Sequence, residues 1–205
     1  NQIPLVLVND IRKSLSEACS KFYTKKPTNI IAVTGTNGKS SVAYFFYQIL
    51  SLYKIPAASI GTLGIISKKY NKKINLTSMD PLSLHNNLQI LVRNNVNHVI
   101  LEASSHGLEQ KRLDNLNINT GIFTNLSHDH LDYHKNMKSY FNAKMYLFKN
   151  LLKKNSKIIT DEENNEFKII KSIANRRGIK LITIGTTSGN IKILHNKYIK
   201  KKTNS

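Results

Sequence analysis

The alternation of short apolar runs with helical segments of about a dozen residues constrains the fold of this chain more than any other feature. Ile30–Val33, His98–Glu102 and Gly121–Thr124 are rich in branched or aromatic residues, a composition typical of strands buried on both faces of a sheet. Between them, Ser40–Tyr53 and the segment that begins at Pro81 repeat apolar residues with the helical period. This pattern predicts an α/β fold, with a mostly parallel sheet and helices on both faces.

The same reasoning divides the rest of the chain. It predicts further strands at 5–8, 57–60, 157–160 and 179–184, and further helices at 11–22, 137–152 and 164–176. A Lys-Lys-Pro-Thr break at residues 25–28 separates the first strand and helix from the others. We therefore expect residues 1–27 to be the end of one domain with its linker, and residues 28–205 to form the next domain.

The composition excludes several classes of protein. The 31 Lys and Arg against 12 Asp and Glu give a net charge of +19, but the lysines are scattered in short groups. Lys, Asn and Ile are all abundant and share A- and T-rich codons, so codon bias explains the charge, and we expect no nucleic-acid partner. The single Cys19 excludes a disulfide framework and suits a reducing cytosol. No apolar run is long enough to span a bilayer, so we expect no membrane insertion.

The strongest functional motif is VTGTNGKSS at residues 33–41, which lies between a predicted strand and a predicted helix. Glycines allow the main chain to turn its N–H groups toward an oxyanion, and the following helix adds its positive end. Lys39 would reach the β- and γ-phosphates of a nucleotide, and the Ser40 hydroxyl would bind Mg²⁺. The alternative is a glycine turn that only connects strand and helix. The predicted ATP-binding residues are Gly35, Thr36, Asn37, Gly38, Lys39, Ser40 and Ser41.

Three further motifs follow in order: EASSHGLEQKR at 102–112, TNLSHDHLDYH at 124–134 and NAKMYLF at 142–148. Together with the glycine loop they resemble the Mur ligase family, and within it the MurE-type branch. The resemblance implies a cytoplasmic, ATP-dependent ligase of peptidoglycan synthesis. Such enzymes add the third amino acid, here expected to be meso-diaminopimelate with L-lysine as the alternative, to UDP-N-acetylmuramoyl-L-alanyl-D-glutamate.

The resemblance also assigns roles to individual residues. Glu102 and His130 are expected to bind Mg²⁺ with Ser40, and Lys144 is expected to react with CO₂ to give a carbamate that binds a second Mg²⁺. Lys39 and the carbamylated Lys144 are the expected catalytic residues. A solvated carboxylate at 102, a structural histidine at 130 and an ordinary surface lysine at 144 are the alternatives. The expected contacts to the sugar-nucleotide substrate are Thr77, Ser78, Ser104, Gln110 and Arg112.

Three interpretations of the function remain open. The first is the ligase just described, with residues 28–205 as a truncated central ATP-binding domain, the C-terminal domain absent and a monomeric state. The second is another amide ligase on the same scaffold, such as folylpolyglutamate synthetase or a different Mur ligase. The third is a non-catalytic, truncated remnant.

Overall fold

The protein is described by a computed structural model that covers residues 5–129 and 131–194. Within these residues, eight strands form one sheet in the order β3-β2-β4-β1-β5-β6-β7-β8. All neighbouring strands are parallel except β2 and β3, which form an antiparallel hairpin. The strands are β1 Asn29–Thr34, β2 Ala57–Gly61, β3 Gly64–Ser67, β4 His98–Glu102, β5 Ile118–Phe123, β6 Lys157–Asp161, β7 Lys180–Gly185 and β8 Ile191–Lys192.

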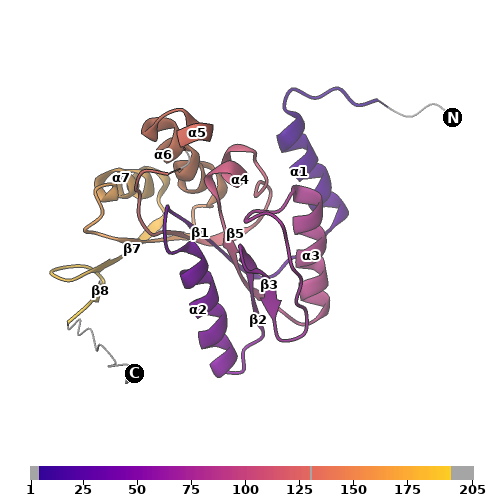
Figure 1. Cartoon of the computed structure of the whole chain (residues 1–205), viewed down its shortest axis with the longest axis horizontal. Helices are drawn as coiled ribbons and strands as arrows, with labels where there is room; N and C mark the ends of the chain where they lie inside the picture. Colours follow the sequence, from indigo (N-terminus) through magenta and orange to yellow (C-terminus); the bar gives the residue numbers. More distant parts are fainter. Residues whose placement is uncertain (1–4, 130, 195–205) are drawn as a thin grey trace, which may run out of the picture.

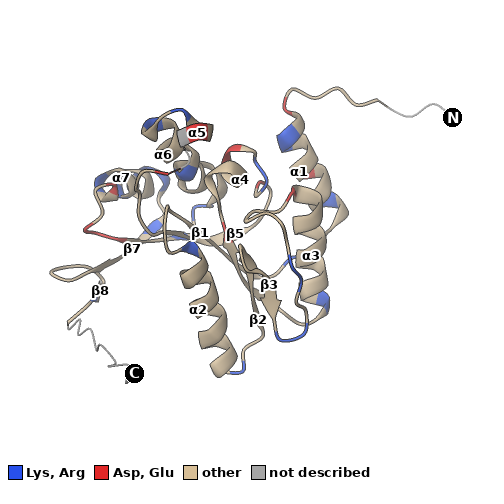
Figure 2. Ribbon diagram, in the orientation of Figure 1, with Lys and Arg blue, Asp and Glu red and all other residues tan. Residues whose placement is uncertain are grey.

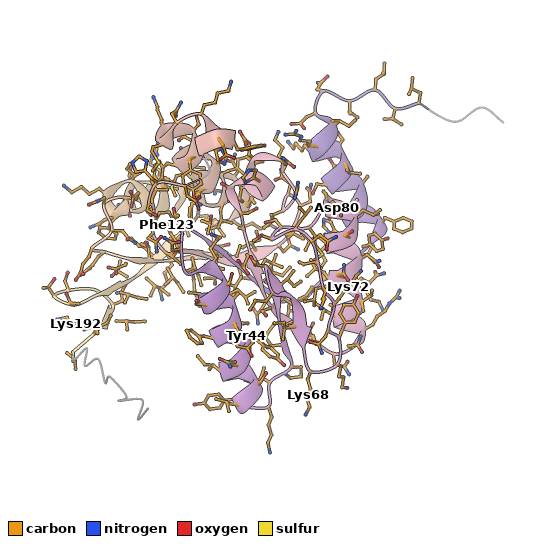
Figure 3. The ribbon with its side chains drawn as sticks, in the orientation of Figure 1. Tyr44, Lys68, Lys72, Asp80, Phe123 and Lys192 are labelled. Carbon is orange, nitrogen blue, oxygen red and sulfur yellow. The ribbon has the colours of Figure 1, made fainter. Side chains whose placement is uncertain are left out.

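Helices cover both faces of the sheet, which confirms the predicted fold class (Figure 1). Helix α2 packs on one face, where Ala43 meets Val33 and Ile100 of the sheet. The larger core lies on the other face and includes Phe123, which contacts Phe148 edge to face (Figure 3). The helices are α1 Ile11–Phe22, α2 Lys39–Leu52, α3 Pro81–Arg93, α4 Ser105–Glu109, α5 Leu131–His134, α6 Met137–Tyr146, the π-helical turn η1 Leu147–Leu151 and α7 Phe167–Arg177.

The order of the strands determines where a site forms. From the central β1 the chain passes through α2 to β2 on one side, whereas from β4 it crosses to β5 on the other side. Val33 lies opposite Glu102 in β4, and Thr34 lies opposite Phe123 in β5, so these three strands end together. In open α/β sheets, ligands bind at such a reversal, outside the carboxyl ends of the strands.

Local sequence signals determine where the helices begin and end. The Asp80 carboxylate (Figure 3) accepts a hydrogen bond from the Ser83 N–H at 2.9 Å, and Pro81 takes the first helical position of α3. Asn136 caps α6 in the same way, through the Ser139 N–H. Gly178, at φ +61°, ends α7 in the left-handed conformation that glycine adopts without strain.

Two sequence-based expectations differ from the structure. Leu5–Val8 is not a strand: these residues are exposed and pair with no strand among the described residues, and an apolar run becomes a strand only when its N–H and C=O groups find a partner. The helix expected at 137–152 changes to a π-helical turn after Tyr146. No helix in the described part of the chain is long and apolar enough to cross a membrane.

The basic residues are spread over several elements, including α1, α3, α6 and α7 (Figure 2). They do not gather along a single described helix. The expectation that the chain binds no nucleic acid stays a prediction.

Candidate functional site

The glycine loop joins β1 to α2, as the sequence predicts. Gly38 has φ +84° and occupies the N-cap of α2, and among the residues that the structure describes no side chain caps this helix. Gly35 has φ +149°, and a Cβ atom built there would lie 1.9 Å from Thr124 Oγ1. Only glycine fits this close approach. The loop therefore leaves the first N–H groups of α2 free to meet an anion at the positive end of the helix.

Lys39 folds back over this loop. Its Nζ donates hydrogen bonds to the main-chain oxygens of Gly35, at 3.0 Å, and Thr36, at 2.6 Å. Burial lowers the pKa of Lys39, and the carboxylates of Glu102 and Asp129 partly oppose that shift. An ammonium held by two carbonyls beside the helix start is in position to meet phosphate oxygens.

Glu102 ends β4 with its side chain 3% exposed. Oε2 accepts a hydrogen bond from Ser40 Oγ at 2.9 Å, and Oε1 accepts one from the Thr62 N–H at 2.8 Å. Gly61 makes room for this carboxylate, because a Cβ there would lie 2.0 Å from Glu102 Oε1. A buried carboxylate and a hydroxyl in direct contact are hard oxygen donors, and this donor set fits Mg²⁺.

Lys144 of α6 is buried, with 1% of its surface exposed. Its Nζ donates a hydrogen bond to the Gly35 main-chain oxygen at 2.7 Å and lies 4.1 Å from the centre of the Tyr140 ring. Burial, and secondly the nearby Lys39 ammonium, lower the pKa of Lys144 to about 7. The structure thus excludes an ordinary surface lysine at this position.

The five residues expected to contact a substrate lie together next to Glu102, whose main-chain oxygen accepts a hydrogen bond from the Ser78 hydroxyl. Thr77 Oγ1 is 3.1 Å from Thr62 Oγ1, and Ser78 Oγ lies 2.9 Å from Ser104 Oγ. Arg112 donates to the Ser78 main-chain oxygen at 2.7 Å. Its Nε and second terminal nitrogen both donate to Gln110 Oε1, at 3.0 and 2.6 Å. The guanidinium is therefore held in one orientation before any ligand binds.

Lys39, Ser40, Glu102 and Lys144 line one cavity of about 400 Å³. Residues of three sequence motifs and of the segment between them line it, whereas Ser78, Gln110 and Arg112 do not. The lining residues are Thr36, Asn37, Gly38, Lys39, Ser40, Ser41, Thr62, Thr77, Glu102, Ser104, Ser105 and Lys144.

His130, the remaining expected Mg²⁺ ligand, lies outside the described residues. Across 5–129 and 131–194, no three His, Cys, Asp or Glu side chains form a cluster that could hold a metal ion. His134 lies in an aromatic cluster, with ring centres 5.4 Å from His106 and 5.2 Å from Tyr140. Since His106 follows β4 and Tyr140 lies on α6, this cluster joins the segments that carry the second, third and fourth motifs.

Sequence reasoning assigned no role to several residues that contact the glycine loop, namely Thr124, Asn125, Ser127 and Tyr140. The Asn125 side chain accepts a hydrogen bond from the Asn37 N–H at 3.0 Å. The Tyr140 hydroxyl lies 3.2 Å from Thr36 Oγ1. Two features of the sequence could have indicated these contacts. Asn125 comes just after a predicted strand, and Tyr140 lies four residues before Lys144.

Comparison with known proteins places this geometry in a family. Residues 33–205 match the model of the Mur ligase middle domain. A UDP-N-acetylmuramoyl-L-alanyl-D-glutamate–2,6-diaminopimelate ligase from Rickettsia bellii is 43% identical over 193 residues, which are 92% of this chain and 40% of that protein. The chain belongs to the Mur ligase family, whose members use ATP and Mg²⁺. It spans about 40% of the length of the curated relatives it matches.

Solved structures give the same result. A structure of a UDP-N-acetylmuramoyl-L-alanyl-D-glutamate–2,6-diaminopimelate ligase matches with a TM-score of 0.76 and 31% identity, covering 91% of this chain and 38% of that one. The FolC protein of E. coli, solved with DHPP and ADP, matches with a TM-score of 0.63, covering 89% of this chain and 48% of that one. At 16% identity the second match shows a shared fold alone.

Proposed function

We propose that this chain is the central ATP-binding part of a ligase that adds the third amino acid, meso-diaminopimelate, to UDP-N-acetylmuramoyl-L-alanyl-D-glutamate. The main support is the single cavity in which Lys39, the Ser40–Glu102 pair and buried Lys144 meet. Similarity to ligases of that name supports the choice of substrates. The reaction belongs to peptidoglycan synthesis in the cytoplasm.

The protein's own groups account for nucleotide binding. The free N–H groups at the start of α2 and the Lys39 ammonium would receive the phosphate oxygens of ATP. The γ-phosphoryl group would pass to the side-chain carboxylate of D-glutamate, and the amine of the incoming amino acid would displace phosphate from the resulting acyl phosphate. Two anions must approach each other in this reaction, so positioning and charge neutralisation are the main tasks of the site.

Side chains of the motifs would hold the Mg²⁺ ions. Ser40, Glu102 and His130 would hold one ion, and Lys144, as its carbamate, would hold a second one. Bound Mg²⁺ supplies positive charge to the phosphate and carboxylate oxygens. The carbamate proposal is supported by the position of Lys144, which is buried beside the loop and at the edge of the cavity.

The remaining residues would hold the sugar-nucleotide substrate. Thr77 and Ser104 line the cavity, and the fixed Arg112 guanidinium has the planar geometry that suits a carboxylate or pyrophosphate. Residues 1–27 would belong to the end of the preceding UDP-binding domain, and residues 28–205 to the central domain. A monomer would suffice, because one chain supplies all these groups.

Calorimetric titration of the purified chain with Mg²⁺ and a non-hydrolysable ATP analogue tests the nucleotide site. We expect binding by the wild type and by Lys138→Ala, which changes an exposed lysine of α6, and at least tenfold weaker binding by Lys39→Ala. Equal affinity in Lys39→Ala would refute the assignment of the loop.

The ligase assay uses the complete reading frame with both substrates. We expect ATP hydrolysis only when the UDP-muramoyl-dipeptide and diaminopimelate are both present. Hydrolysis that depends on a folate and glutamate instead would identify the second type of amide ligase. Nucleotide binding without any substrate-dependent hydrolysis would support a non-catalytic remnant.

A further inference from the structure

Two N–H groups of the glycine loop do not point to the cavity but to the segment that follows β5. The Thr36 N–H donates to the Asn125 main-chain oxygen at 2.9 Å. The Asn37 N–H donates to the Asn125 side-chain oxygen at 3.0 Å. In the first half of the loop, the N–H groups of Thr36 and Asn37 are therefore already bonded to acceptors of the protein itself.

The same segment also donates hydrogen bonds to the main-chain oxygen of Asn37. Thr124 Oγ1 donates to this oxygen at 2.7 Å, and Asn125 Nδ2 donates to it at 3.3 Å. Asn37 is thus bound through both its N–H and its C=O, which fixes the orientation of the main chain on either side of it. Gly35 allows this arrangement, because any Cβ there would displace the Thr124 hydroxyl.

The second half of the loop behaves differently. The N–H groups of Lys39, Ser40 and Ser41 are the first of α2 and have no acceptor within their own helix. Among the described residues, no side chain caps this helix at Gly38 either. All three residues line the cavity, as do Thr36, Asn37 and Gly38 before them. The orientation of this half depends on the fixed half that precedes it, because Asn37 leads directly into Gly38.

We propose that Asn125 is a positioning residue for nucleotide binding: its amide side chain fixes the Asn37 peptide groups and so aims the N–H groups at the start of α2 toward the phosphates. This inference rests on the proposed ATP site. Asn125 acts through the loop and does not line the cavity.

The test compares Asn125→Ala with a matched control. Asn119 lies on β5 and likewise accepts a main-chain N–H, that of Ile30 of β1, at 2.8 Å, but at the opposite end of the strand. Asn119→Ala therefore removes a similar hydrogen bond far from the loop. Both variants and the wild type are measured by calorimetric titration with Mg²⁺ and a non-hydrolysable ATP analogue, and by NMR-detected amide exchange without nucleotide.

We expect Asn125→Ala to bind the analogue about tenfold more weakly, since it loses two hydrogen bonds that orient the loop. Without nucleotide, exchange of the Asn37 amide should accelerate about tenfold. The Thr36 amide should change less, because its acceptor is a main-chain oxygen that remains. Asn119→Ala should bind the analogue as the wild type does.

Wild-type affinity in Asn125→Ala, or an equal loss of affinity in both variants, would overturn the proposal. An Asn37 amide that exchanges at the wild-type rate in Asn125→Ala would also overturn it. If the wild type binds no nucleotide, the proposed function fails, and the exchange measurement still decides whether Asn125 fixes the loop.

Discussion

The buried histidine of α3 gives a prediction that is independent of any ligand. His85 is 1% exposed, and its pKa is lowered from 6.5 to about 4. Burial is the main cause and the charge of Lys26 the second, while the main-chain carbonyl of Asp114 opposes them. The folded state thus favours the neutral ring, whereas the unfolded chain protonates it near pH 6.5. Its contribution to stability is present above pH 6.5 and is lost as the pH falls toward 4.

The size of the effect follows from the two pKa values. Between pH 8 and pH 5, preferential protonation of the unfolded state lowers the free energy of unfolding by about 2 kcal/mol. For a domain of this size that corresponds to a fall in Tm of about 4–8 °C. In His85→Leu this part of the acid destabilisation should disappear. In Lys26→Met it should become smaller, because removing the nearby cation raises the pKa of His85.

Thermal unfolding followed by circular dichroism at pH 8 and pH 5 provides the measurement. The quantity compared is the difference in Tm between the two pH values for each protein, so a change in stability at pH 8 does not affect it. The reasoning is refuted if His85→Leu loses as much stability between these pH values as the wild type does.

Three further predictions concern the proposed site. Lys39→Ala should abolish ATP turnover in the complete enzyme, since the phosphate-binding ammonium is lost; turnover near the wild-type rate would contradict this. Lys144→Ala should be inactive and partly rescued by added short carboxylates such as acetate, and the carbamate proposal fails if the variant is active without them. Gly61→Ala should push the Glu102 carboxylate aside, because its Cβ would lie 2.0 Å from Oε1. It should destabilise the fold by about 1–3 kcal/mol and weaken Mg²⁺-dependent nucleotide binding at least tenfold, measured by chemical denaturation and calorimetry. Unchanged Mg²⁺-dependent binding would contradict the assigned role of Glu102.

The central part of the fold could be predicted because its signals are local. The apolar runs that become β1, β4 and β5 are largely buried, and each is followed by a motif. Helix caps such as Asp80 act within one turn and can be recognised in the sequence. The Leu5–Val8 strand was predicted wrongly, because pairing depends on a partner strand that its own sequence does not specify.

The site residues that could be predicted from the sequence are those with a charged side chain or a place in a spaced motif. Lys39 and Glu102 line the same cavity because the ends of β1 and β4 are in register, and a parallel sheet implies this arrangement. The position of Asn125 after a predicted strand marks it as a candidate, but its role could not be predicted, because its partners are the main-chain atoms of Asn37, 88 residues earlier in the chain. The burial of Lys144 also depends on tertiary packing, since α6 itself has polar residues on several sides.

The central position of β1 has a consequence for biosynthesis. Asn29 pairs with His98, and Ile30 pairs with Ile118, so the strand before the glycine loop gains its neighbours from much later parts of the chain. Contacts so distant in sequence slow folding, because a long loop must close before they form. On the ribosome the loop must therefore wait for residues up to Asn125 to emerge, and a bound nucleotide cannot assist the nascent chain before then.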